Sequence, residues 1–121
     1  MSALQIHKVE IDCRELTDWQ AFHSAFAEKL GFPSYYGRNM DAWYDCFYSL
    51  ADESTVLKLA EGDVVWLELK HYKDLQARQP ELAEAILEGA AFVNFTLDDE
   101  RGRAGTQPWT LIGAVAVSAF E

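Results

Sequence analysis

The stretch VVWLEL, residues Val64 to Leu69, decides the fold of this chain. It is a short apolar run of strand-forming residues, and a Glu61-Gly62-Asp63 turn precedes it. Such a run predicts a strand that is buried on both faces. We therefore expect a sheet whose faces are covered by helices.

Two further strands are expected on either side of this stretch. LQIHKVEID, residues 4–12, nearly alternates apolar and polar residues, but its phase shifts once, as in a strand with a bulge or an early end. WTLIGAVAVSAF, residues 109–120, reads as another buried strand. Val56, Leu57 and Leu59 could add a short strand before the turn.

Helical spacing of apolar residues predicts four helices between these strands. The first lies in residues 16–31, with Thr17 as N-cap, Gln20 completing a capping box and Gly31 as the stop. The others are expected from Asn39 to about Ala51, within residues 70–79, and from Pro80 through residue 95. Residues 98–108, DDERGRAGTQP, are expected to form an exposed loop.

The order β-α-α-β-α-α-β predicts an α/β fold with a small three-stranded parallel sheet and about four helices. The 121 residues fit one domain, 1–121, because no repeat or linker divides them. Cys13 and Cys46 are expected to be free thiols, since two cysteines make no disulfide framework here.

Charge and hydropathy restrict the partners of the protein. Asp and Glu total 20 against 10 Lys and Arg, a formal charge of −10, so the field repels nucleic acid and attracts basic partners. No apolar run approaches the roughly 20 residues that cross a bilayer, and the start lacks the pattern of a signal peptide. We expect a cytoplasmic protein that binds neither membranes nor nucleic acid.

The second helix separates apolar from acidic residues when its positions are spaced about 100° apart. With Met40 at zero, an apolar side between about 240° and 340° holds Trp43, Cys46, Phe47 and Leu50. The opposite side, between about 80° and 140°, holds Asp41, Asp45, Tyr48 and Asp52. No Lys or Arg occurs from Asn39 to Thr55. The acidic side can be an ordinary solvated face or a binding face, and the residues alone leave both open.

No pattern of catalytic or metal-binding residues accompanies this acidic face. Asp41 and Asp45 on one convex face lack the cleft that paired catalytic carboxylates require, and a metal site with a distant histidine has no better support. His7, His23 and His71 have no ligand or catalytic spacing, and Cys46 lies on the apolar side of its helix. We expect neither an enzyme nor a cofactor.

PSYYGRNMDAWYDC, residues 33–46, resembles the signature of the barstar family of intracellular ribonuclease inhibitors. The family pattern is Tyr-Tyr-Gly-x-Asn-hydrophobic-Asp-Ala-x-aromatic-Asp-Cys, which the chain meets from Tyr35 to Cys46. Phe32-Pro33 and VVWLELKHY resemble other parts of the family. The resemblance implies a single barstar-like domain with a parallel three-stranded sheet and four helices, in agreement with the periodicity.

The resemblance also implies a function and a site. Family members inhibit a basic, barnase-like ribonuclease made by the same cell, and their second helix and preceding loop enter the enzyme's cleft. By this resemblance Asp45 would be the principal anchor at a phosphate site and Asp41 the second acid. The other expected partner-binding residues are Tyr35, Gly37, Asn39, Ala42, Tyr44 and Tyr48. The free protein is expected to be a monomer.

Several positions depart from the family pattern. Tyr44 stands where the best-known member has tryptophan, and Ser49-Leu50 replaces a Gly-Trp pair. The family's acid from the last helix has no aligned counterpart, although Glu88 lies nearby. Additions near 52–63 and 98–108 lengthen the chain. A different target nuclease is therefore open.

Two other functions stay open beside ribonuclease inhibition. The same fold could serve as an interaction or immunity module that binds another basic toxin or a regulator. A hydrolase that uses Asp41 and Asp45 would require a concave pocket at this helix.

Overall fold

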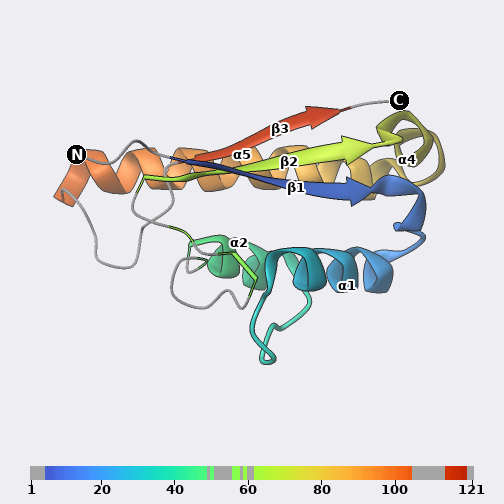
Figure 1. Ribbon diagram of the computed structural model, residues 1–121, viewed down its shortest axis with the longest axis horizontal. Helices are drawn as coiled ribbons and strands as arrows, with labels where there is room; N and C mark the ends of the chain where they lie inside the picture. Colours follow the sequence, from blue (N-terminus) through green and yellow to red (C-terminus); the bar gives the residue numbers. More distant parts are fainter. Residues whose placement is uncertain are drawn as a thin grey trace.

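The fold is a parallel sheet with helices packed against it (Figure 1). The structure, a computed structural model, describes residues 5–48, 50, 56–57, 59, 62–104 and 114–119, and for 97–104 and 114 the backbone only. The strands β1 (Ile6–Asp12), β2 (Val64–Lys70) and β3 (Ala114–Ala119) are parallel in the order β1-β2-β3. The described helices are the 3-10 turn η1 (Cys13–Glu15), α1 (Trp19–Leu30), α2 (Met40–Tyr48), α4 (Tyr72–Arg78) and α5 (Pro80–Ala104). The predicted fold class and element order are confirmed.

The two ends of α1 show how local sequence sets a helix. Asp18, not the predicted Thr17, is the N-cap, because its Oδ1 accepts a hydrogen bond from the amide of Ala21 at 2.8 Å. At the other end, Gly31 takes a left-handed conformation with φ 70° and its amide bonds to the Ala27 carbonyl. The predicted stop at Gly31 is confirmed.

α5 is longer than the sequence predicts. The helix continues from Pro80 through Ala104, so the expected exposed loop at 98–108 is wrong for residues 98–104. Charged residues such as Asp, Glu and Arg are compatible with a helix, and one glycine weakens a helix without ending it. Residues 105–108 lie outside the described residues. Val56, Leu57 and Leu59, the described positions of the expected additional strand, are not in a strand.

The sheet has a continuous register. β1 pairs with β2 from Ile6 opposite Val64 to Asp12 opposite Lys70 without a break, so the phase shift in its sequence is not a bulge. Ile6 is 63% exposed, whereas Val9 and Ile11 are buried. The shift therefore reflects an apolar residue on the exposed face of the strand.

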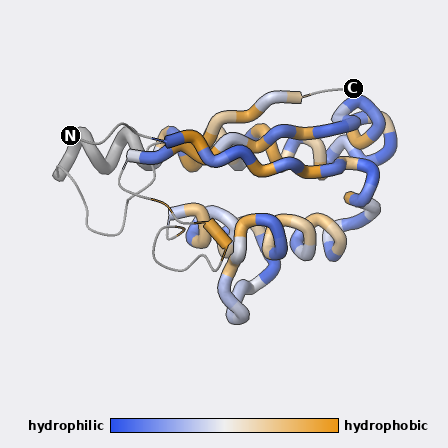
Figure 2. The backbone as a smooth tube through the Cα atoms, viewed as in Figure 1, coloured by the Kyte–Doolittle hydropathy of each residue, from blue (hydrophilic) through white to orange (hydrophobic). Residues whose placement is uncertain are grey.

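The sheet has one buried and one polar face, which corrects the expectation that β2 is buried on both faces. Val65, Leu67 and Leu69 are fully buried, while Val64 and Trp66 on the alternate face are only half-buried. Figure 2 shows the corresponding mixture of hydrophobic and hydrophilic residues along the strands.

Polar contacts hold the second face of the sheet together. Glu68 is buried there because it forms ion pairs with Lys8 at 3.3 Å and Lys70 at 2.6 Å. Trp66 donates its indole N–H to Ser118 Oγ at 2.7 Å, and the Lys8 ammonium lies 5.7 Å from the Trp66 ring centroid. These contacts give hydrogen-bond and ion-pair partners to polar groups on this face, which sequence periodicity alone predicts to be buried and apolar.

Gly89 allows α5 to approach α2 closely. A side-chain carbon at this position would lie 2.7 Å from Cζ3 of Trp43 and 3.3 Å from Cε of Met40. Trp43 is fully buried and packs edge-on against Phe26, with ring centroids 5.6 Å apart. The glycine that weakens the predicted helix is thus explained by the indole that it accommodates.

We predict that Gly89→Ala destabilises the protein. Alanine is favoured over glycine by about 1 kcal/mol in a helix, but the added methyl must displace a buried ring, and overpacking costs about 1–3 kcal/mol. Urea unfolding measures the difference, with Ala91→Gly at an exposed position of α5 as the control for helix propensity. A Gly89→Ala variant more stable than the native protein would show that the contact is not tight.

Candidate functional site

The helix α2 begins with a side-chain cap. Asn39 Oδ1 accepts a hydrogen bond from the amide of Ala42 at 2.8 Å, and its backbone carbonyl accepts one from Trp43 at 2.9 Å. Asn39 Nδ2 also donates to the carbonyl of Gly37 at 3.3 Å. The predicted cap is confirmed, and it links the preceding loop to the first turn of the helix.

The two sides of α2 are placed as its sequence predicts. Trp43, Cys46 and Phe47 are buried, whereas Asp41 and Asp45 are exposed. Trp43 and Phe47 pack together with ring centroids 4.3 Å apart. The helix is therefore fixed to the core by one face and presents the two carboxylates to solvent on the other.

The preceding loop places its two tyrosines differently. Tyr35 is 70% exposed, as a contact residue requires, but the ring of Tyr36 is buried. The Tyr36 hydroxyl is hydrogen-bonded to Nδ1 of His23, and its ring packs against Phe32 with centroids 4.9 Å apart. Burial raises the pKa of Tyr36, and burial together with the nearby charge of Arg38 lowers the pKa of His23.

Arg38 fixes the loop to α1, a role that the sequence motif does not reveal. Its guanidinium Nη2 donates to the Gln20 carbonyl and to Ser24 Oγ, both at 2.8 Å. Arg38 has φ 57°, the left-handed conformation that favours glycine, whereas the neighbouring Gly37 does not have a positive φ. The strained residue of the loop is therefore the arginine that makes the contacts.

The remaining predicted contact residues on α2 are partly accessible to solvent. Ala42, Tyr44 and Tyr48 are half-buried. The ring of Tyr44 packs against Phe92 of α5 with centroids 4.6 Å apart. Phe92 is 48% exposed and was not predicted as a site residue, because its packing against α2 depends on tertiary structure.

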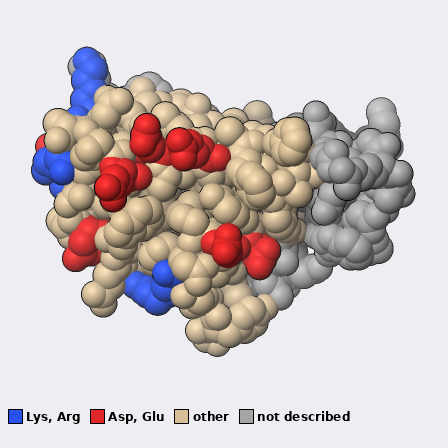
Figure 3. All heavy atoms as spheres, turned by 180° about the vertical axis from the view of Figure 1, so that it is seen from behind, with Lys and Arg blue, Asp and Glu red and all other residues tan. Residues whose placement is uncertain are grey.

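Asp41 and Asp45 contrast with those acidic residues of the described chain that form ion pairs. Elsewhere Asp12 pairs with Arg14 at 2.9 Å, and Asp74 pairs with Arg78 at 2.8 Å. In the described part of the chain neither Asp41 nor Asp45 has an ion pair or a hydrogen bond from a side chain. Figure 3 shows acidic side chains gathered over α5 and over α2, with uncharged surface between them.

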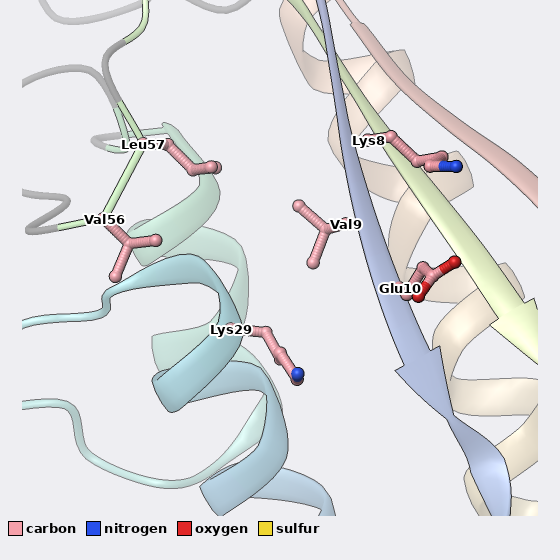
Figure 4. Close-up of a pocket in the computed structure, with 6 residues that line it drawn as sticks. All are labelled: Lys8, Val9, Glu10, Lys29, Val56 and Leu57. Atoms are coloured by element: carbon pink, nitrogen blue, oxygen red, sulfur yellow. The ribbon is translucent and has the colours of Figure 1, made fainter.

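Among the described residues, two hollows lie near the helices. One of about 290 Å³, lined by Trp19, His23, Arg38, Asn39 and Met40, adjoins the start of α2. The other, of about 520 Å³, lies between β1 and the end of α1 (Figure 4), where Val9 points toward Leu57 while Lys8 and Glu10 point to the other side of the strand. The second hollow contains none of the predicted site residues.

The described part of the chain has neither a metal-binding cluster nor a membrane-spanning helix. Its His, Cys, Asp and Glu side chains form no group of three that could hold a metal ion. None of its helices has the length and apolarity needed to span a bilayer.

The comparison with known families establishes the family membership that the loop and α2 indicate. Residues 6–104 match the family described as "Barstar (barnase inhibitor)". This chain belongs to the barstar family. A curated protein of Bacillus subtilis (strain 168), named "Putative ribonuclease inhibitor YrdF", is 33% identical over 84 residues, which cover 65% of this chain and 92% of the relative.

Membership of the barstar family confirms the predicted resemblance and the kind of protein. Barstar proteins are inhibitors that bind a ribonuclease, so this is an inhibitor-type protein and not an enzyme. The matched region includes the loop, α2 and the whole of α5. It also includes Tyr44, where the chain departs from the family pattern, and Glu88, which cannot be aligned with the family's acid from the last helix.

We predict that His23 makes stability depend on pH. The pKa of His23 is lower in the folded state than its ordinary 6.5, so as the pH falls below 6.5 the unfolded chain binds the proton first and stability is lost. His23→Gln removes this titration. The gap in unfolding free energy between the native protein and this variant should therefore narrow from pH 8 to pH 5.5, as measured by urea unfolding. A gap that is constant over this range would contradict the prediction.

Proposed function

We propose that this protein inhibits a basic, barnase-like ribonuclease by placing the outer face of α2 and the preceding loop in the enzyme's active-site cleft. Two exposed carboxylates, Asp41 and Asp45, carry the proposal, because they lie one helical turn apart and have no cation paired with them in the described part of the chain. Family membership and the name of the Bacillus subtilis relative support a ribonuclease as the partner.

The chemistry of a ribonuclease cleft complements these carboxylates. An enzyme that binds RNA presents Arg and Lys to phosphate, and the same side chains form short, charge-assisted hydrogen bonds with a carboxylate. Asp45 is assigned the phosphate site and Asp41 a second cation. Excess negative charge on the inhibitor, formally −10, increases the rate of encounter with a basic enzyme.

The rigidity of α2 also favours binding. The buried Trp43 and Phe47 fix one side of the helix, and Asn39 caps its start. A surface held in its binding geometry loses little conformational entropy on association. Tyr35, Gly37, Asn39, Ala42, Tyr44 and Tyr48 complete the proposed contact surface.

The cellular setting follows from this activity. We place the protein in the cytoplasm as a monomer that neutralises the enzyme within the cell that makes it. In this role it requires no cofactor. The full chain 1–121 acts as one barstar-like domain.

Asp45→Ala should weaken inhibition more than any other single change on α2. Loss of the principal anchor is expected to raise Kd at least about 30-fold, the level of a binding hot spot, and Asp41→Ala should have a smaller effect. Inhibition of RNA cleavage by a barnase-type enzyme measures both. Glu10→Ala, an equal change of charge on the sheet, is the control and should leave Kd nearly unchanged.

Three outcomes would count against the proposal. If Asp45→Ala inhibits as well as the native protein, α2 does not enter the cleft. If the native protein inhibits no such enzyme but captures another basic protein, the interaction-module alternative is correct. An association rate that does not fall as salt rises would contradict electrostatic steering.

Gly37→Ala should separate binding from folding. A side-chain carbon at Gly37 would lie 3.4 Å from Cβ of Ala42 and from Nδ2 of Asn39, which is ordinary contact, so the fold tolerates it. At a surface that the enzyme approaches closely, the extra methyl should raise Kd about tenfold through misfit. Unchanged stability with weakened inhibition is the expected result, and unchanged inhibition would place Gly37 outside the contact.

A further inference from the structure

The aromatic contact between α2 and α5 extends the candidate surface beyond the sequence motif. Tyr44 packs against Phe92, with ring centroids 4.6 Å apart, and Phe92 remains 48% exposed. Phe95, one turn further along α5, is 69% exposed. The acidic face of α2 is thus continuous with an exposed apolar strip, defined here as Phe92 and Phe95.

The orientation of α5 shows which side of the helix this strip occupies. Gly89 and Phe92 contact α2, through Trp43 and Tyr44 respectively. At about 100° per residue, Glu88 lies about 40° from Phe92 around the helix, so both are on the edge toward α2. Leu87 is also exposed but lies about 140° from Phe92, on the opposite edge.

Acidic residues of α2 and α5 adjoin the apolar strip. Asp41 and Asp45 of α2 lie beside the strip, and Glu88 of α5 lies one turn before Phe92 on the same stripe of the helix, all three of them exposed. The uncharged surface that separates acidic groups over α2 and α5 is visible in Figure 3. Aromatic side chains bordered by charged residues are characteristic of the centre and rim of a protein interface.

We propose that Phe92 and Phe95 form a second part of the inhibitory surface, which receives an apolar side chain on the rim of the ribonuclease's basic cleft. The proposal rests on the function proposed above and specifies its partner: the enzyme carries an exposed aliphatic or aromatic group next to its basic residues. Continuity with Tyr44 and complementarity of charge favour this occupant. An enzyme with only basic residues along its rim would leave the two phenylalanines against charged groups.

Phe92→Ser and Leu87→Ser form a matched pair for testing this role. Phe92→Ser is expected to raise Kd for a barnase-type ribonuclease about tenfold, mainly through faster dissociation, whereas Leu87→Ser should change it less than about twofold. Phe92→Leu should retain most of the affinity. Urea unfolding of each variant confirms that it is folded.

Salt dependence distinguishes the apolar strip from the acid pair. Phe92→Ser should leave the dependence of the association rate on ionic strength as in the native protein, whereas Asp45→Ala should reduce it. If Phe92→Ser binds like the native protein while Asp45→Ala does not, this inference is wrong and the proposed function stands. If the native protein inhibits no ribonuclease, the proposed function itself fails.

A second copy of this chain is the competing occupant of the strip. Sedimentation of the native protein and of Phe92→Ser tests it. A native dimer that becomes a monomer on substitution would overturn the proposal, and a native monomer at the concentrations of the binding assay supports it.

Discussion

The absence of a side chain at Gly89 is the constraint on which the candidate surface depends. It allows α5 to lie against the indole of Trp43, and Trp43 in turn fixes the rotation of α2. Once that rotation is fixed, Asp41 and Asp45 must face solvent and Tyr44 must face α5. A core contact therefore determines the orientation of the surface carboxylates, because a short helix cannot turn about its axis without displacing a buried ring.

Two carboxylates of the described chain have a structural role in the sheet. Glu68 is buried and held by two lysines, and Asp63 accepts hydrogen bonds from the backbone of Gln5 and from His7. These carboxylates stabilise the edges and the outer face of the sheet. The pair on α2 has no such role in the described residues, and like charges one turn apart destabilise a helix by a few tenths of a kcal/mol. Tertiary packing of α2 outweighs that cost.

Periodicity and the local motif predicted the element order, the two faces of α2 and the Asn39 cap, because each depends on residues close in sequence. They did not predict the polar face of the sheet, since Glu68 becomes acceptable there only through lysines on β1 and β2. They also missed Arg38, whose contacts reach back to α1, and Phe92, whose ring meets Tyr44 across two helices. These features arise from tertiary contacts between distant segments, which a single sequence does not encode in its spacing.

The packing of Phe92 against Tyr44 explains how the departure from the family pattern at Tyr44 changes the surface. A tyrosine in place of the family's tryptophan reduces the aromatic area that α2 alone can present, but Phe92 lies against it and adds a second ring from α5. The aromatic surface is thereby distributed over two helices and adjoins acids of both. Binding to such a surface requires a partner that matches the separation of the helices as well as the charges on α2. A change of one ring on α2 and one on α5 can therefore alter partner selection while Asp41 and Asp45 stay in place.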